Sequence, residues 1–472
     1  MVLCIRNSSS QRCETLLPAG ESLSIHGAFR RCNTLRITKK INVKMQMNED
    51  TGGVAQQKTK LVPVILIPGA GGNQLEARLT AEYLPPSWIC RCDPFALRSI
   101  TKRSEIRELE EIEDGFSRLW LSVPGILPPF TSCFADRIRL LYNSDNGIAE
   151  NAPGVETRVP YFGSTEGMKY LDPSFRRLSV YMAVLIEALE AEGYVDGESI
   201  FGAPYDFRYA PGKHASHVAS SFLRDLKGLI EIAYMNNGKQ PVIILSHSLG
   251  GLWALHFLRQ QSLTWQQEYI GHFIAVSTPW GGTVQSMKIF ASGYAEGAPF
   301  INPLLLRAEQ RSSESNLWLL PTPATFDKQV LVTTERDSYS ACDISRFLED
   351  VGYPEGVPLY ESRIPALVES LNPPFIPVTI VYSDGIDTPL MLAYGRKGFE
   401  HQPLVTYGDG DGTVNLQSLM GVLNRWKALQ GEDLEVINLH GKTHSTILTD
   451  KQAVNTLVEI VLSKPRHAEI LS

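Results

Sequence analysis

Short apolar runs recur along the chain at wide intervals and predict its architecture. They lie at residues 61–67, 241–245, 272–276, 377–382 and 434–439. Near-continuous runs of this length are typical of strands that are covered on both faces, as in a parallel sheet. The pattern therefore predicts an α/β protein with a mostly parallel sheet and helices on both faces.

Segments with helical periodicity lie between these runs. Residues 177–192 carry apolar side chains at helical spacing and end before Gly193, a common stop signal for helices. A second helix is predicted upstream of residues 241–245, where apolar residues again repeat every three or four positions. The first stripe contains Leu178, Met182, Leu185, Ile186 and Leu189, and the second contains Val218, Phe222, Leu226, Leu229, Ile230 and Ala233.

Two long tracts, rich in Pro, Trp and charged residues, do not continue this alternation of apolar runs and helical segments. A length of 472 residues suits one α/β domain with large insertions better than three small domains. We predict a flexible basic segment and linker at residues 1–57 and a single domain at residues 58–472. Its insertions are expected at about 78–176, as a membrane-docking and lid region, and at 280–372, as a cap.

The N-terminal segment differs in charge from the rest of the chain. Residues 1–44 contain eight Lys or Arg but only Glu14 and Glu21 as acids, so the remainder is more negative than the net charge of −7. This start resembles an organelle transit segment, although a misassigned start upstream of Met45 or Met47 explains it equally well. An acidic body without basic runs argues against nucleic acid as a partner and predicts that any membrane contact is mainly apolar.

The lengths of the apolar stretches and the number of cysteines exclude further classes of protein. No uninterrupted apolar stretch reaches about 18 residues, so a membrane-spanning helix is not expected, and residues 1–30 lack the apolar region of a secretory signal. Seven cysteines are too few and too scattered for a disulfide scaffold. Cys90 and Cys92 have no second Cys or His pair at zinc-finger spacing, so no zinc site is expected.

The strongest local motif is Ser-His-Ser-Leu-Gly at residues 246–250. It follows a predicted buried strand and precedes the helix-like residues 252–258. This arrangement is that of a nucleophile elbow, in which small residues two positions before and after the nucleophile let neighbouring chains pass. Ser246 stands where a glycine is more usual. The motif predicts an α/β-hydrolase fold with Ser248 as the nucleophile.

A serine hydroxyl needs a histidine base and a carboxylate that orients the histidine. In this fold the acid and then the histidine follow the nucleophile along the chain. Asp409 and Asp411 follow the fourth predicted strand, and His440 and His444 follow the last one. The two aspartates lack the third ligand and the closing Glu of a calcium loop, so no metal site is predicted.

The negative charge that develops on an attacked carbonyl requires hydrogen-bond donors that are already in place. The amide of Leu249 and an amide of the loop at residues 69–72, after the first strand, are suited to supply them. Gln74 stands where a dinucleotide fingerprint would need a third glycine, so this loop is not expected to bind a nucleotide. Because the nucleophile, base and donors all come from the chain, no cofactor is expected.

A broader pattern comes from six stretches of the chain, at residues 68–77, 151–155, 203–208, 246–250, 278–282 and 408–414. Through these stretches the chain resembles the lecithin-cholesterol acyltransferase and lysosomal phospholipase A family, especially its plant members, from about residue 61 to residue 461. The resemblance implies that the nucleophile is Ser248, the acid Asp411 and the base His444, with Asp409 and His440 as runners-up.

The resemblance also implies structural details around the site. The oxyanion amides are expected at Ala70 and Leu249. Members of the family often carry a bulkier residue where Gly71 stands, so this loop is expected to be looser here. A lid disulfide in the family implies that Cys90 pairs with Cys133.

Two tryptophans are expected to contact substrate or membrane. Trp88 lies in an apolar segment at residues 84–89, which would form a docking tip, and Trp280 lies in one of the family-like stretches. The alternative for Trp88 is packing in the protein core.

The predicted function is acyl transfer from a glycerophospholipid through an acyl-serine intermediate, to an alcohol acceptor (O-acyltransferase) or to water (phospholipase A). Alternatives are a neutral-lipid or small-ester hydrolase and a non-catalytic lipid-binding protein with a hydrolase fold. The expected partner is a lipid at a membrane or other interface, and the oligomeric state is left open. An endomembrane, vacuolar or secreted location follows if the disulfide forms, and a plastid or other organelle follows if residues 1–44 are a transit segment.

Overall fold

In the computed structural model the described residues belong to one unit of the chain, and the segment predicted at residues 1–57 lies outside them. None of the described helices is long and apolar enough to cross a membrane. The described residues are 61–91, 115–143, 147–212, 216–295, 298, 300–369 and 371–464.

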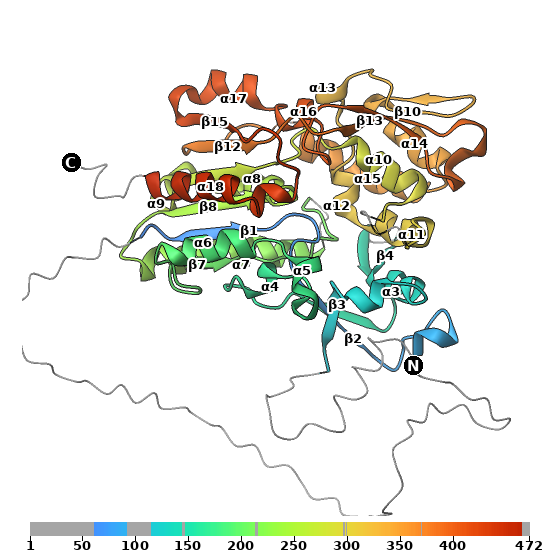
Figure 1. The fold of residues 1–472 in the computed structure, drawn as a ribbon, viewed down its shortest axis with the longest axis horizontal. Coiled ribbons are helices and arrows are strands. Elements are labelled where there is room, and N and C mark those ends of the chain that lie inside the picture. The colour runs from blue at the N-terminus through green and yellow to red at the C-terminus, as the bar shows by residue number, and fades with distance from the viewer. Residues whose placement is uncertain are drawn as a thin grey trace, which may run out of the picture. The chain divides into compact units, whose positions relative to one another are not determined.

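A six-stranded parallel sheet forms the centre of this unit, with strands running from β15 at the top of Figure 1 to β7 at the bottom. All neighbouring strands in it are parallel. The order is β15 (Leu434–Asn438), β12 (Val378–Tyr382), β9 (Ile270–Val276), β8 (Val242–His247), β1 (Val64–Ile67) and β7 (Ile200–Gly202). The predicted parallel α/β sheet is confirmed. Only β7 was not predicted, because three residues are too few to show a periodicity.

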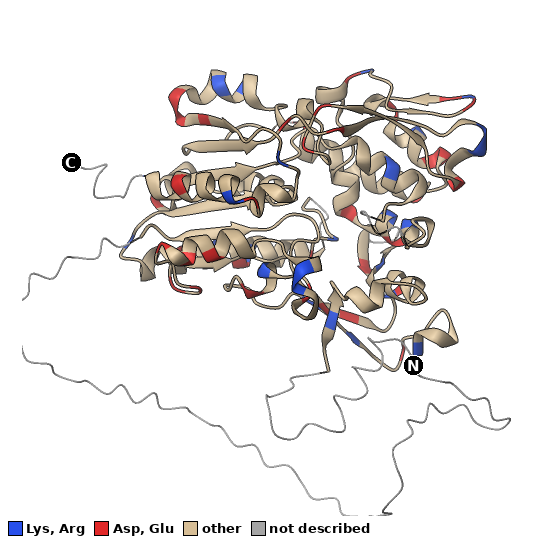
Figure 2. Cartoon of the chain, viewed as in Figure 1, with Lys and Arg blue, Asp and Glu red and all other residues tan. Residues whose placement is uncertain are grey.

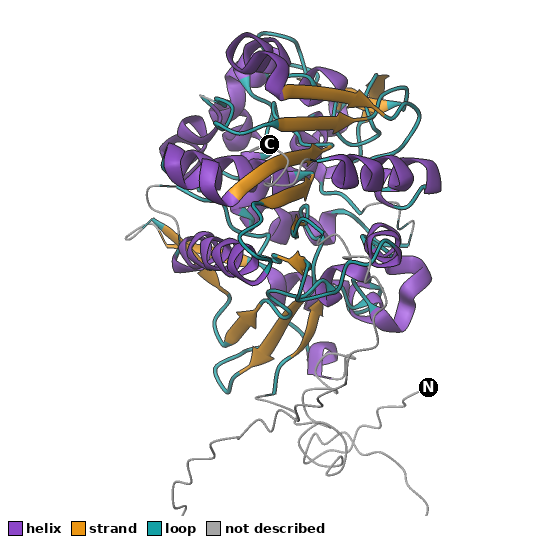
Figure 3. Ribbon diagram, turned by 90° about the vertical axis from the view of Figure 1, so that its left-hand side faces the viewer, coloured by secondary structure: helices purple, strands orange, loops and turns teal. Residues whose placement is uncertain are grey.

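Helices cover both faces of the sheet (Figures 1 and 3). Successive side chains of a strand point to opposite faces. Val64 and Leu66 of β1 therefore join the core beneath α6 (Ala183–Ala191) and α18 (Lys451–Ser463). Ile65 and Ile67 join the core on the opposite face, which is covered by α7 (His217–Asn236), α8 (Leu249–Gln260) and α10 (Val284–Ser292). Another helix, α9 (Leu263–Tyr269), leads into β9.

The helix predicted at residues 177–192 is wrong in its first half. The structure has the short α5 (Arg176–Ser179), then an extended Val180, and only then α6. Val180 forms a β-bridge to Tyr170, which takes this stretch out of the helix and leaves Leu178 at 73% exposure. In α7 the predicted helix is present, although Val218 is exposed and Ala219 is the buried residue of the first turn.

The tract expected as the first insertion contributes no strand to the six-stranded sheet in its described part. It packs as small sheets and short helices around a separate apolar cluster, to which Ile301 and Leu306 of the second tract also contribute. Its elements are β2 (Leu75–Leu79), η1 (Trp88–Arg91), β3 (Ser117–Trp120), α2 (Val123–Ile126), α3 (Thr131–Ile138), β4 (Leu140–Asn143), β5 (Ile148–Asn151), β6 (Val155–Arg158), α4 (Glu166–Lys169) and η2 (Pro173–Phe175).

The second tract is mainly helical and shares a small four-stranded sheet with residues further along the chain. Its elements are α11 (Leu304–Ser312), α12 (Glu314–Trp318), α13 (Pro323–Phe326), β10 (Val332–Thr333), β11 (Ser338–Tyr339), η3 (Ala341–Asp343), α14 (Ile344–Asp350) and α15 (Gly356–Val368). The small sheet is completed by β13 (Thr388–Ala393) and β14 (Leu404–Gly408), and η4 (Gly395–Glu400), α16 (Leu416–Leu419), α17 (Leu423–Gln430), η5 (Gly431–Asp433) and η6 (Thr446–Leu448) complete the remaining chain.

Charged residues of both signs are interspersed over the described part of the chain (Figure 2). Two pairs of opposite charge are buried together, Arg208 with Asp206 and Arg363 with Glu314. Buried Asp172 pairs with the partly buried Arg118, and buried Arg311 donates to the backbone carbonyls of Phe290 and Val351. A buried charge is tolerated when a partner and hydrogen bonds replace the lost water.

His272 is a buried polar residue inside the sheet, on β9. Its Nε2 lies 2.7 Å from Thr379 Oγ1, and that hydroxyl donates to Glu435 at 2.8 Å. Because the hydroxyl proton is used on Glu435, the histidine must donate from Nε2. Burial, with a smaller effect of Lys464, lowers the pKa of His272 to about 3.

The low pKa of His272 should make the free energy of unfolding depend on pH. An unfolded histidine binds a proton below about pH 6.5, whereas folded His272 stays neutral down to about pH 3. Acidification between these values therefore favours the unfolded state. In urea titrations, His272→Gln should lower the pH slope of the unfolding free energy by about 1.4 kcal/mol per pH unit. If plots of the unfolding free energy against pH were parallel for variant and wild type between pH 4 and 6, this prediction would be contradicted.

Candidate active site

Ser248 lies in the sharp turn between β8 and α8. Its backbone adopts φ 55° and ψ −130°, a left-handed region that is strained for a residue other than glycine. The Ser248 amide donates to Val276 on the next strand at 2.8 Å. A side chain at Gly250 would overlap the carbonyls of Ile67 and Pro68. The turn therefore presents the serine side chain above the sheet and requires a glycine two positions later.

Ser246 occupies the position where a glycine is more usual in such a motif. It is fully buried, and its hydroxyl is 3.4 Å from the carbonyl oxygen of Ile274 on β9. The hydroxymethyl group therefore fits between β8 and β9, and the substitution leaves the turn intact.

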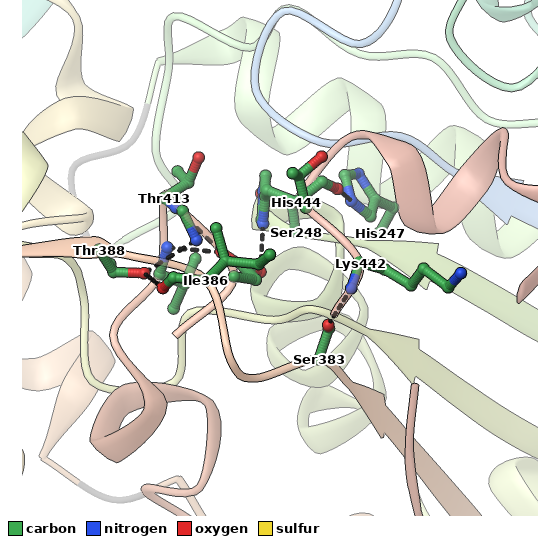
Figure 4. A network of polar contacts seen from close by, with 12 residues as sticks. His247, Ser248, Ser383, Ile386, Thr388, Thr413, Lys442 and His444 are labelled. Carbon is green, nitrogen blue, oxygen red and sulfur yellow. Dashed lines mark hydrogen bonds and ion pairs between the residues drawn. The ribbon is translucent and has the colours of Figure 1, made fainter. Parts of the chain in front are cut away.

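The structure brings Ser248, His444 and Asp411 together in one line of hydrogen bonds. Figure 4 labels Ser248 and His444 within this network. His444 Nε2 lies 2.8 Å from Ser248 Oγ, and His444 Nδ1 lies 2.7 Å from Asp411 Oδ2. Since an ionised carboxylate only accepts, Nδ1 carries the proton and Nε2 is the atom that can take a proton from the serine. This is the arrangement of a nucleophile, a general base and an orienting acid.

Asp411 is fully buried and is prepared to stay ionised. Its Oδ1 accepts from the amides of Val414 at 2.8 Å and Thr413 at 3.1 Å. Burial by itself would raise the pKa of Asp411, but His444 and these two amides outweigh it, and the pKa lies below its usual value. A charged acid is thus held against the imidazole.

The loop that carries Asp411 does not follow β12 directly, as the sequence suggested. The chain first forms β13 and β14 in the small sheet and then returns, so that Asp411 bridges to Ile386 near the end of β12. The amide of Gly412 donates to Thr388 Oγ1 at 2.8 Å, which anchors the returning loop.

The alternative acid and base candidates lie in other contacts. His440 is exposed, and its Nδ1 is 2.6 Å from Asp384. Asp409 accepts from the amide of Gly385 at 2.7 Å. The structure therefore pairs Asp411 with His444 and leaves Asp409 and His440 outside this line. Within the described ranges, no cluster of three or more His, Cys, Asp or Glu side chains is arranged to hold a metal ion.

The glycine-rich loop after β1 lies against the nucleophile. A side chain at Gly69 would come within 2.8 Å of Ser248 Cβ, so the loop approaches the serine as closely as its backbone allows. In the described part of the chain, the amides of Ala70 and Leu249 donate to no protein group. Neither amide is therefore committed to a protein acceptor.

The expectation that this loop is loose at Gly71 is not met. Gly71 has φ +66°, and its carbonyl accepts from Trp120 Nε1 at 2.7 Å. A Cβ at this position would meet the Trp120 ring at 2.9 Å. The indole occupies the space that a larger residue would need and holds the loop from outside.

Two further polar residues, His247 and Tyr181, adjoin the site and were not singled out from the sequence. His247 Nε2 lies 2.9 Å from the carbonyl oxygen of His444, and its Nδ1 lies 2.7 Å from Tyr181 Oη. Tyr181 Oη also accepts from the amide of Gly69 at 2.8 Å. His247 was visible as the residue before the nucleophile, but nothing in the sequence marks a tyrosine 66 positions earlier as its partner.

The predicted partners Cys90 and Cys133 form a disulfide in the structure. The bridge has an S–S distance of 2.04 Å and joins η1 to α3 across 43 residues. Trp88, in η1, is 67% exposed and Leu84 is 84% exposed, so the segment presents apolar side chains to solvent. Core packing, the alternative considered for Trp88, is therefore wrong.

The docking role expected for Trp280 is not supported. Its side chain is 1% exposed and packs against Trp426, with ring centroids 5.1 Å apart. The residues that follow explain the burial: side chains at Gly281 and Gly282 would overlap Thr325 and the carbonyl of Leu320. This stretch is packed under α13, so Trp280 is part of the core.

The parallel sheet, the strained turn after β8 and the order Ser, Asp, His along the chain define an α/β hydrolase. The chain belongs to the lecithin:cholesterol acyltransferase family, whose model matches residues 116–362.

Curated relatives agree with this assignment. The chain is 46% identical to lecithin-cholesterol acyltransferase-like 1 of Arabidopsis thaliana, over 85% of this chain and 90% of that protein. It is 34% identical to lysosomal phospholipase A and acyltransferase of Rattus norvegicus, over 85% and 91%. It is 33% identical to phosphatidylcholine-sterol acyltransferase of Mus musculus, over 86% of each. The protein is an enzyme of the acyltransferase and phospholipase type that acts on lipid.

The disulfide should matter more at a lipid interface than for a small ester. Closing a loop of this length is worth roughly 3–4 kcal/mol in chain entropy, and the bridge adjoins the exposed Trp88 segment. Replacing Cys90 and Cys133 together by serine should lower turnover on phospholipid vesicles several-fold more than turnover on a short soluble ester. Cys342→Ser, which removes an exposed free thiol, is the matched control. Equal losses on both substrates would contradict this interpretation.

Proposed function

We propose that this protein transfers a fatty acyl group from a glycerophospholipid, through an acyl-enzyme on Ser248, to an alcohol acceptor or to water. The observation that supports this most strongly is the continuous line from Ser248 through His444 to Asp411, with distances of 2.8 Å and 2.7 Å. The matching lipid acyltransferase family supports the class of substrate.

In the first half-reaction, His444 Nε2 removes the proton of Ser248 as Oγ attacks the ester carbonyl. The tetrahedral oxyanion is bound by the amides of Ala70 and Leu249, and each such donor typically contributes about 3–4 kcal/mol to transition-state stabilisation. The intermediate collapses when the bond to the glycerol oxygen breaks. His444 returns the proton to that oxygen, and a lysophospholipid leaves.

In the second half-reaction, the acceptor oxygen takes the place of the departed lipid. His444 removes its proton, the oxygen attacks the acyl carbonyl, and the proton returns to Ser248 Oγ as the acyl bond breaks. The same base and the same amides serve water and alcohols. Which product forms depends on which acceptor occupies the site.

Contact with a lipid surface is proposed for the segment around Trp88. The exposed Leu84 and Trp88 are apolar and lie beside the disulfide that anchors η1. Exposed apolar side chains at the edge of a domain suit insertion into the interfacial zone of a bilayer. The substrate would then be drawn from the membrane rather than from free solution.

Removal of the nucleophile or the base should abolish turnover. Ser248→Ala and His444→Ala should each lower kcat about 10⁴-fold or more, with little further loss in the double variant, because triad residues act as a unit. His440→Ala is the matched control, since this exposed histidine pairs with Asp384. Loss of activity in His440→Ala, with His444→Ala active, would show that the base is assigned wrongly.

The acceptor is identified from the products of acyl-labelled phosphatidylcholine with and without a long-chain alcohol. Wild type should release lysophosphatidylcholine in both cases, and the label should appear as free fatty acid without alcohol and in part as alkyl ester with it. Preference for triacylglycerol or for short soluble esters would favour the alternative hydrolases. Failure of a fluorophosphonate to label Ser248 in folded protein would favour a non-catalytic lipid-binding protein.

We propose that the protein works in an oxidising compartment, which is endomembrane, vacuolar or extracellular. The Cys90–Cys133 bridge supports this, because such bonds persist where the redox environment is oxidising. Mass spectrometry of unreduced peptides from native tissue tests it, and free thiols at both positions would favour the organelle location suggested by residues 1–44.

A further inference from the structure

His247, the residue before the nucleophile, has a role that the proposed chemistry does not use. His247 is the last residue of β8, directly before the turn that carries Ser248. Its side chain is 2% exposed and contacts both the backbone of His444 and the hydroxyl of Tyr181. A buried imidazole with both nitrogens engaged is fixed in place.

The direction of every hydrogen bond around His247 follows from the chemistry of its partners. The carbonyl of His444 can only accept, so His247 Nε2 carries the proton. His247 Nδ1 then has a free lone pair, and Tyr181 must donate its hydroxyl proton to it. The amide of Gly69 can only donate, and it donates to Tyr181 Oη. Burial lowers the pKa of His247 to about 3, which is consistent with this neutral tautomer.

The result is a directed chain of three hydrogen bonds, from Gly69 through Tyr181 and His247 to the carbonyl of His444. One end is the residue before Ala70, the proposed oxyanion donor. The other end is the backbone of the proposed base. The chain thus joins two loops that are far apart in sequence and must act on the same substrate carbonyl.

Packing around Tyr181 agrees with a fixed position for its ring. A side chain at Gly72 would meet the Tyr181 ring at 2.7 Å, so the ring lies against the glycine-rich loop. The Tyr181 amide donates to Lys169 at 3.0 Å, in the extended break between α5 and α6. The interruption of the predicted helix is what places this tyrosine under the loop.

We propose that Tyr181 and His247 are positioning residues. Through these three hydrogen bonds they keep the glycine-rich loop at residues 69–72 and the backbone of His444 in fixed positions relative to each other. The inference rests on the proposed function and deepens it. Neither residue reacts with substrate. Tyr181 fixes the tautomer of His247 and the Gly69 amide, and His247 fixes the backbone of His444, whose own amide is held by the Asp411 carbonyl at 2.7 Å.

Loss of the Tyr181 hydroxyl should disturb both ends of the chain. The Gly69 amide would be left buried without its partner, which favours movement of the loop. His247 could also take the other tautomer, in which a lone pair at Nε2 faces the His444 carbonyl and repels it. Misplacement of catalytic groups by about 1 Å can lower rates about 100-fold. Tyr181→Phe should therefore lower kcat for a short soluble ester between 10- and 100-fold and leave KM within about threefold.

Tyr194→Phe is the matched control for Tyr181→Phe. Tyr194 is also a buried tyrosine, and its hydroxyl donates to the carbonyl of Val62 at 3.1 Å, at the opposite end of β1 from the site. Both variants lose one buried hydroxyl and should lower the unfolding temperature by similar amounts. Only Tyr181→Phe should lower kcat. Equal kcat values for wild type and Tyr181→Phe, with Ser248→Ala inactive, would overturn this inference and leave the proposed function standing.

Variants of His247 test the same series of hydrogen bonds at the end that contacts His444. His247→Gln keeps an N–H that can reach the His444 carbonyl, whereas His247→Leu removes it, so the Gln variant should retain several-fold more kcat. Adding Tyr181→Phe to His247→Leu should lower kcat by a smaller factor than Tyr181→Phe does in the wild type, because only the bond to the Gly69 amide is then left to lose. The proposal would be overturned if the kcat losses of the two single variants multiplied in full in this double variant. Equal kcat values for the Gln and Leu variants would also overturn it. An inactive wild type would instead refute the proposed function.

Discussion

The close approach of two turns at the carboxyl ends of β1 and β8 is the constraint on which the site depends. Ser248 has a left-handed backbone, and Gly250 leaves no room for a side chain beneath the carbonyls of Ile67 and Pro68. Gly69 lies equally close to Ser248 Cβ. Because adjacent parallel strands end at the same edge, the nucleophile and the loop with the candidate oxyanion donors are forced together.

The base is held by its backbone as well as by its side chain. His444 contacts Ser248 and Asp411 through its two ring nitrogens, and its amide donates to the Asp411 carbonyl. Its carbonyl accepts from His247. A loop residue has many conformations to lose, so several anchors are needed to keep the imidazole aligned with the serine.

The electrostatics of the site favour a positive charge on His444 during turnover. Asp411, with its pKa held low by His444 and two amides against the effect of burial, supplies the compensating negative charge. His247, whose ring centroid is 4.8 Å from that of His444, has its pKa lowered to about 3 and adds no second positive charge. Because water screens buried charges only weakly, these charges have a large effect on the electrostatic energy of the site.

The apolar runs and the Ser-His-Ser-Leu-Gly motif by themselves determined the parallel sheet and Ser248, because strand, turn and helix signals depend on neighbours a few residues away. Resemblance to the family supplied Asp411, His444 and the Cys90–Cys133 pair. Only the tertiary structure decided that Trp280 is core, that Trp120 holds the loop at Gly71, and that the helix breaks before Tyr181. Those outcomes depend on contacts between segments tens of residues apart, and a short sequence pattern carries no information about which distant side chain fills a given space.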